Sequence, residues 1–114
     1  MSKMNMANQF NLMQKVQKEI AELQDKLEEM SVEGSAGGEM VMVTASGKQK
    51  ILSIKIDPTV VIPEDVEMLE DLIAAATNQA LEKSKQMAQE EMQKIAGGVL
   101  GGLPGGLKIP GLNL

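Results

Sequence analysis

Pairs of adjacent carboxylates are the residues of this chain that come closest to acid–base or metal chemistry. They occur at Glu28/Glu29, Glu64/Asp65, Glu70/Asp71 and Glu90/Glu91. Neighbouring residues on a helix point in different directions, so such pairs are typical of a solvated helix face. The chain also has no His, Cys, Trp, Tyr or Arg, which removes most nucleophiles, metal ligands and proton-transfer groups. We therefore expect neither an enzyme nor a site for a metal, a cofactor or a small-molecule substrate.

The glycine-rich stretch between Val32 and Pro58 resembles a phosphate-binding loop only superficially. No glycine stands five positions before the Gly47-Lys48 pair, so the Walker signature is absent. Glycines 34, 37, 38 and 47 instead fall where hairpins between short strands need them. We interpret these glycines as turn residues.

A long helix is predicted before this stretch. Apolar side chains recur every three or four residues, as on one face of a coiled coil. They are Met13, Val16, Ile20, Leu23, Leu27 and Met30. A helix of about 28 residues would be roughly 42 Å long at 1.5 Å per residue, which exceeds the needs of a small domain.

Three antiparallel strands are predicted next, over 32–36, 40–45 and 50–57, with turns at Gly37-Gly38 and Ser46-Gly47. Apolar residues alternate so that both faces of the middle strand carry them, so we expect one face to meet helices and the other a partner. A second helix of over 30 residues should begin at Pro63 and stop at Gly97-Gly98. The fold class is thus α+β: long helix, three-stranded antiparallel meander, long helix.

The chain divides into a single α-β3-α domain over residues 1–96 and a Gly/Leu-rich tail over 97–114, expected to be flexible. Helices longer than the strands must overhang the sheet, and their apolar stripes would be covered by antiparallel pairing into an arm. An unpaired sheet edge and a second apolar face predict a homodimer joined through the sheets. The candidate interface residues are Val41, Val43, Leu52, Ile54 and Ile56.

Charge is segregated along the sequence although the net charge is only −5. Residues 1–18 and 83–96 together hold six lysines and two acids, whereas residues 19–30 and 58–82 hold one lysine and eleven acids. In antiparallel helices the two basic stretches would meet at the arm tip. A dimer with two basic tips is the footprint of a protein that grips duplex nucleic acid by its phosphates. The candidate DNA-binding residues are Lys3, Lys15, Lys18, Lys83, Lys85 and Lys94.

The sequence contains few side chains that could recognise the bases of DNA. Without Arg there is no bidentate contact to guanine, and Phe10 is the sole aromatic residue, so stacking of single-stranded bases is not expected. Contacts to the backbone of double-stranded DNA remain.

Several stretches together resemble the YbaB/EbfC family of bacterial nucleoid-associated proteins. They are KLEEM at the end of the first helix, then VEGSAGGEMVMVTASGK, SIKIDP, VEMLEDLIAAATNQAL and the GG-rich tail, so the resemblance covers essentially the whole chain. It implies a tweezer-shaped homodimer with a β-sheet core and protruding helices, which binds DNA and organises the nucleoid or regulates expression. The family has no catalytic motif to carry over.

Two functions stay open at this point. The first is a dimeric duplex-DNA binder located in the cytoplasm, at the nucleoid. The alternative is a coiled-coil protein–protein interaction module without direct DNA binding, suggested by the ten methionines and the aliphatic tail. No apolar run approaches the roughly 20 residues of a membrane span, so no membrane partner is expected.

Overall fold

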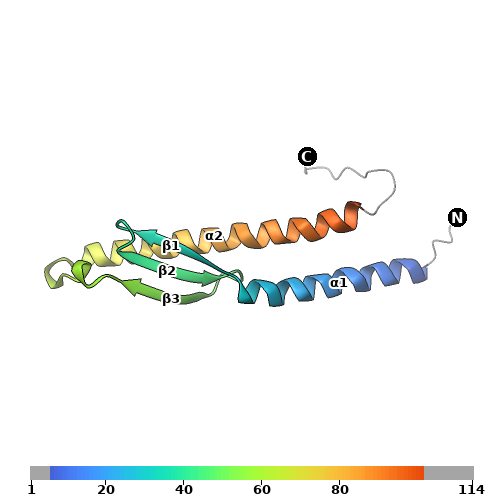
Figure 1. Ribbon diagram of the computed structural model, residues 1–114, viewed down its shortest axis with the longest axis horizontal. Coiled ribbons are helices and arrows are strands. Elements are labelled where there is room, and N and C mark those ends of the chain that lie inside the picture. Colours follow the sequence, from blue (N-terminus) through green and yellow to red (C-terminus); the bar gives the residue numbers. More distant parts are fainter. Residues whose placement is uncertain (1–5, 102–114) are drawn as a thin grey trace.

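The computed structural model describes residues 6–101, with side chains described from residue 8 to residue 97. Its element order is α1 (Met6–Glu29), β1 (Ser31–Ala36), β2 (Val41–Ser46), β3 (Ile51–Ile56) and α2 (Val66–Gly101), with two short 3-10 turns at Pro58–Val60 and Pro63–Asp65. The predicted α+β order of long helix, meander and long helix is confirmed. The molecule is elongated, 75 × 27 × 16 Å, with the sheet at one end and both helices extending beyond it (Figure 1).

The core lies between α2 and two of the three strands. The sheet order is β1-β2-β3, antiparallel throughout, and α2 packs across β1 and β2. Val41, Val43 and Ala45 of β2 are fully buried against Ala76 and Ala80 of α2. Small alanines at a spacing of four residues form a flat stripe that lets the helix approach the sheet closely.

One glycine fixes how close this approach is. Gly34 is paired with Val43 in the middle of β1, and a Cβ atom added there would overlap the backbone oxygen of Ala76 and the backbone nitrogen of Ala80. The hairpin role predicted for Gly34 is therefore wrong, because this glycine lies in a strand and makes room for α2. Gly37 and Gly38 do have the turn conformation, with φ of 64° and 66°.

Both turns differ from the prediction in length. The first spans 37–40, so Met40 is a turn residue and not the start of a strand. In the second turn Gln49 has φ of 62°, a conformation that a non-glycine residue adopts at a cost. The sequence did not predict it, because a positive φ is usually expected at a glycine and this position is Gln. Between Thr44 and Ala45 the register with β3 shifts by one residue, which bends the edge strand.

The second helix does not stop at Gly97-Gly98 as predicted, since α2 continues to Gly101. A glycine inside a helix costs about 1 kcal/mol relative to alanine but ends the helix only if it turns left-handed, and Gly97 does not. The predicted tail over 97–114 thus begins within α2, and its residues 102–114 lie outside the described part of the chain.

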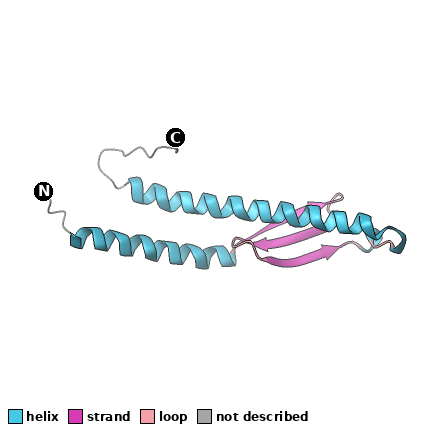
Figure 2. Ribbon diagram, turned by 180° about the vertical axis from the view of Figure 1, so that it is seen from behind, coloured by secondary structure: helices cyan, strands magenta, loops and turns pink. Residues whose placement is uncertain are grey.

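α2 runs beside the sheet and continues beyond it, where α1 lies antiparallel to it and the two helices form an arm, as Figures 1 and 2 both show. Leu23 and Leu27 of α1 are buried, so the apolar seam predicted on this helix is packed where the arm leaves the sheet. Farther out, Met13 and Phe10 are exposed. The packing of the seam thus weakens outward along α1, since Ile20 and Val16 are half-buried and Met13 is exposed.

Candidate nucleic-acid interface

The outer part of α1 carries two exposed lysines that precede the first acidic residue of the sequence, Glu19. Lys15 and Lys18 are both exposed, and no Asp or Glu occurs in the sequence before Glu19. Neither lysine forms an ion pair with a described residue. Their ammonium groups are available to an anionic partner, whereas Lys3 lies outside the described residues.

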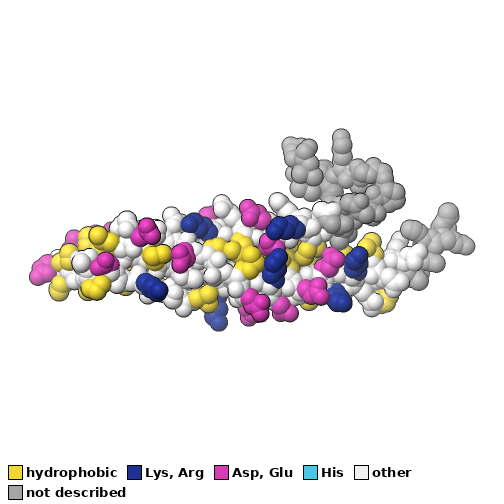
Figure 3. All heavy atoms as spheres, viewed as in Figure 1, with side chains coloured by type: hydrophobic (Ala, Val, Ile, Leu, Met, Phe, Trp, Pro, Cys, Tyr) yellow, Lys and Arg dark blue, Asp and Glu magenta, His cyan; other side chains and the backbone are white. Residues whose placement is uncertain are grey.

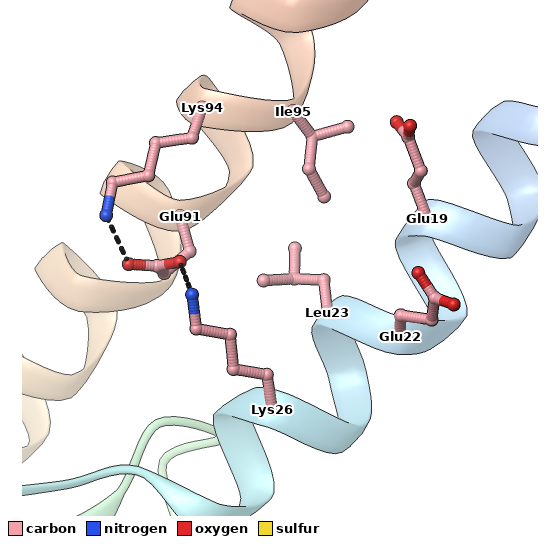
Figure 4. Close-up of a pocket in the computed structure, with 7 residues that line it drawn as sticks. All are labelled: Glu19, Glu22, Leu23, Lys26, Glu91, Lys94 and Ile95. Atoms are coloured by element: carbon pink, nitrogen blue, oxygen red, sulfur yellow. Dashed lines mark hydrogen bonds and ion pairs between the residues drawn. The ribbon is translucent and has the colours of Figure 1, made fainter.

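Lys94 is held in an ion-pair network between the two helices. The Glu91 carboxylate accepts one hydrogen bond from Lys26 Nζ of α1 at 2.7 Å and one from Lys94 Nζ at 2.9 Å (Figure 4). Glu91 is only 8% exposed, and the hydrogen bonds from Lys26 and Lys94 hold its pKa below the usual value. The hydrogen bond to Glu91 raises the pKa of Lys94. We call this group of three residues the arm latch.

Lys83 and Lys85 do not lie at the arm tip. Lys83 Nζ donates a hydrogen bond of 2.9 Å to the backbone oxygen of Glu33 in β1, so this part of α2 is still beside the sheet. The prediction that six lysines meet at the tip is wrong, because α2 runs its first half along the sheet and continues beyond Ile95. In Figure 3, basic and acidic side chains are accordingly interspersed along the molecule.

A second group of lysines surrounds the point where the arm leaves the sheet. The buried Ser84 hydroxyl donates to the Ser46 oxygen at 2.6 Å and accepts from the Gln49 amide at 3.0 Å. This contact brings together the residues that flank Ser84 and those that flank Gln49. We name these four the root lysines: Lys48, Lys50, Lys83 and Lys85.

Sequence reasoning missed two of the root lysines and one lysine of the arm latch. Lys48 and Lys50 were assigned only to a turn and a strand, although a turn at the end of the sheet adjoins the start of the arm. Lys26 lies in the acidic stretch 19–30 and was counted only as part of it. Its ion pair with Glu91 of the other helix cannot be seen from charges summed along the sequence.

The predicted dimer residues separate into two groups. Val41 and Val43 are 0% exposed, so the packing of α2 already uses their side chains and they have no surface left for a partner. In β3, Leu52 is 51% exposed and Ile54 is 45% exposed, while Ile56 is half-buried. Only this strand retains apolar surface among the residues proposed for the interface.

The sheet has one closed edge and one open edge. Along β1, the Ser35 amide donates to Gln79 Oε1 at 2.7 Å and the Glu33 oxygen accepts from Lys83, so side chains of α2 occupy the hydrogen-bonding groups of this edge. At β3 no described side chain does so, and α2 leaves this strand uncovered (Figure 2). Ile54 and Ile56 are paired with Val43 and Val41 and hence share the face on which α2 packs, beyond the reach of that helix.

The opposite face of the sheet differs from the expectation of a second apolar surface. Apart from Met42, its residues are polar, because the register places Glu33, Thr44 and Ser53 there together with Lys55. An apolar partner would therefore meet the β3 edge and not this face.

The sequence pattern of the YbaB/EbfC DNA-binding family matches residues 1–99. The chain belongs to this family. Two similar relatives are a nucleoid-associated protein from Syntrophobacter fumaroxidans, 54% identical with 96% of this chain and 99% of that one covered, and one from Moorella thermoacetica, 52% identical with 89% and 95% covered. The resemblance to YbaB/EbfC proteins stated from sequence is thus confirmed.

A solved structure shows the same fold as this YbaB/EbfC chain. It is an uncharacterized protein from Helicobacter pylori, which aligns with a TM-score of 0.63 at 22% identity over 84% of this chain and 97% of that one. At that identity the likeness concerns the fold alone.

The YbaB/EbfC family is described as DNA-binding and not as a family of enzymes. Within residues 6–101, no group of three or more Asp or Glu side chains is placed to hold a metal ion. The same part of the chain contains no helix long and apolar enough to cross a membrane.

Proposed function

We propose that this chain is a nucleoid DNA-binding protein that acts as a homodimer and grips duplex DNA mainly through its phosphate backbone. Membership in the YbaB/EbfC DNA-binding family carries this proposal, and the names of the relatives support a location at the nucleoid, in the cytoplasm. We also propose a role in nucleoid organisation or gene regulation, which the association of the relatives with the nucleoid supports.

The placement of the lysines refines the DNA-binding surface. The root lysines and the arm lysines Lys15 and Lys18 lie along one protomer, from the end of the sheet outward. Lysines contact phosphates as point charges and without bidentate base recognition. Lys83 has a structural task at the β1 edge as well, and Lys94 must share its ammonium group with Glu91. We therefore assign the main contacts to Lys15, Lys18, Lys48, Lys50 and Lys85, with Lys3, Lys83 and Lys94 as additional candidates.

The homodimer is supported by the open edge of β3. Leu52 and Ile54 present apolar side chains there, and Val61 and Ile62, which follow the strand, are exposed as well. An edge strand with exposed aliphatic side chains is a template for pairing with another chain. A second copy that covers β3 would leave the arms free to project from a common base.

Duplex binding should depend steeply on salt. Each phosphate neutralised lowers the slope of log affinity against log salt concentration by about 0.9, so four to eight contacts predict a slope of about −4 to −7. Affinity should be measured by fluorescence anisotropy from low to physiological salt with duplexes of unrelated sequence. A flat response would contradict the proposal.

Paired substitutions test the surface itself. Lys15→Gln with Lys18→Gln removes two proposed contacts, and so does Lys48→Gln with Lys85→Gln. Each pair should weaken binding to all sequences alike and, because a homodimer loses four lysines, make the slope shallower by up to about 4. Lys55→Gln is the matched control, because Lys55 is exposed on the polar face of the sheet. If the control weakens binding as much as the pairs, the charge and not the surface determines affinity.

A further inference from the structure

A groove of about 340 Å³ lies between the two helices beside the arm latch. Leu23 of α1 and Ile95 of α2 face one another across it and form an apolar floor (Figure 4). The latch stands on one side, and Glu19 and Glu22 stand on the other. The groove therefore has an apolar centre between walls of different charge.

The two walls differ in what they can still bind. Lys26 and Lys94 already donate to Glu91. Among the described residues, neither Glu19 nor Glu22 has a hydrogen-bond or ion-pair partner. An occupant that fits both the floor and this free acidic wall must carry a positive charge between aliphatic side chains.

The chain itself contains such a segment just beyond α2. Lys108 is the only charged residue after Lys94, and it stands between Leu107 and Ile109. The segment begins where α2 ends, at Gly101. To return to Ile95 it must run back about 9 Å along the helix, and the seven residues up to Lys108 span up to about 23 Å when extended. Glycine pairs on the way permit a reversal of direction.

We propose that residues Leu107–Ile109 bind in the interhelical groove of their own chain, with the Lys108 ammonium group on Glu19 and Glu22 and the two aliphatic side chains over Leu23 and Ile95. This site shares only Lys94 with the candidate DNA-binding lysines, and it is independent of whether the protein binds DNA. Its occupant would cover the apolar seam of the arm where helix pairing ends.

Carbodiimide coupling of the full-length protein without DNA tests the proposal. The reagent joins a lysine amine directly to a carboxylate that it touches, and mass spectrometry of the peptides identifies the pair. We expect Lys108 to couple to Glu19 or Glu22. Glu28 and Glu29, exposed on the same helix outside the groove, give the background for random encounters. Coupling of Lys108 to all four glutamates at similar yield would overturn the proposal.

Substitutions that spare the reacting groups provide a second measurement. Leu107→Ser with Ile109→Ser removes the apolar contacts, and the yield of the Lys108 coupling should fall about tenfold. Leu112→Ser with Leu114→Ser is the matched control and should leave the yield unchanged. An equal loss in the control pair would contradict docking of this particular segment.

The origin of the segment is decided by isotopes. A mixture of ¹⁵N-labelled and unlabelled protein, allowed to exchange before coupling, should give coupled peptides that are wholly light or wholly heavy. Mixed peptides would show that the segment of a second copy occupies the groove and would overturn the assignment to the same chain.

Discussion

At the scale of single residues, Gly34 determines how the sheet and α2 fit together. Replacing Gly34 by Ala forces a methyl group onto backbone atoms of Ala76 and Ala80, which no side-chain rotation can relieve. We expect a loss of about 3 kcal/mol in the free energy of unfolding, measured by chemical denaturation at one fixed protein concentration.

The control for this substitution is Gly38→Ala. No atom lies within 4 Å of a Cβ at Gly38, but its φ is +66°, so this variant should lose only about 1 kcal/mol through backbone strain. A Gly34→Ala variant that is as stable as the Gly38→Ala variant would show that β1 and α2 are not held at this distance.

At the scale of elements, the arm latch joins α1 to α2 in a pH-dependent way. The pKa of Glu91 is lowered in the folded protein from an ordinary value of 4.5, so the unfolded chain takes up the proton first as the pH falls. The stabilisation is therefore complete above about pH 4.5 and is lost as the pH falls through the lowered pKa. Glu91→Gln should lower the melting temperature at neutral pH, and its difference from the wild type should shrink towards acidic pH.

Glu90→Gln supplies the comparison, since Glu90 is the exposed neighbour on the same helix turn. Its melting temperature should stay close to that of the wild type at every pH. If the effect of Glu91→Gln is the same at acidic and neutral pH, the latch does not act through the carboxylate charge.

The sequence predicts the helices and strands themselves but not how α2 packs on the sheet. The period of the apolar residues was enough for both helices and all three strands, because local burial sets that period. The position at which α2 packs along the sheet depends on the contact of Gly34 with Ala76 and Ala80. This contact joins distant segments, so no pattern of neighbouring residues in the sequence predicts it. This packing places Lys83 beside β1 and not at the arm tip. The two basic stretches of the sequence therefore do not meet at the tip as predicted.

Hydrogen bonds between distant segments explain the other differences. Gln49 has φ of 62°, and its backbone amide donates a hydrogen bond to the Ser84 hydroxyl. The turn conformation thus coincides with a hydrogen bond to a residue 35 positions later in the sequence. The lysines of the second turn became candidates for binding DNA only through this contact. By contrast, the exposed lysines of α1 needed no tertiary information.

At the scale of the whole molecule, the two sheet edges differ in what covers them, and this difference favours β3 as the interface of the proposed homodimer. The β1 edge is occupied by Gln79 and Lys83, so pairing there would first have to displace side chains of α2. The β3 edge presents Leu52 and Ile54 at about half exposure. A dimer formed through β3 would bury both residues twice by symmetry.

Replacing Leu52 and Ile54 by Ser should therefore weaken the dimer strongly while leaving the core, which contains neither residue, intact. Full burial of an aliphatic side chain contributes about 1.5 kcal/mol or more, and each of these two is already about half buried in the protomer. Four lost side chains therefore cost about 3 kcal/mol or more, which predicts an increase in the dimer dissociation constant of at least about 100-fold. Sedimentation equilibrium measures this constant, and circular dichroism checks that the monomer is folded.

Leu12→Ser is the control, because Leu12 is an exposed aliphatic residue far from the sheet on α1. A dimer that survives the β3 substitutions but not the Leu12 substitution would place self-association in the arms. The two arms, proposed to bind DNA, would then face each other instead of projecting from a common base.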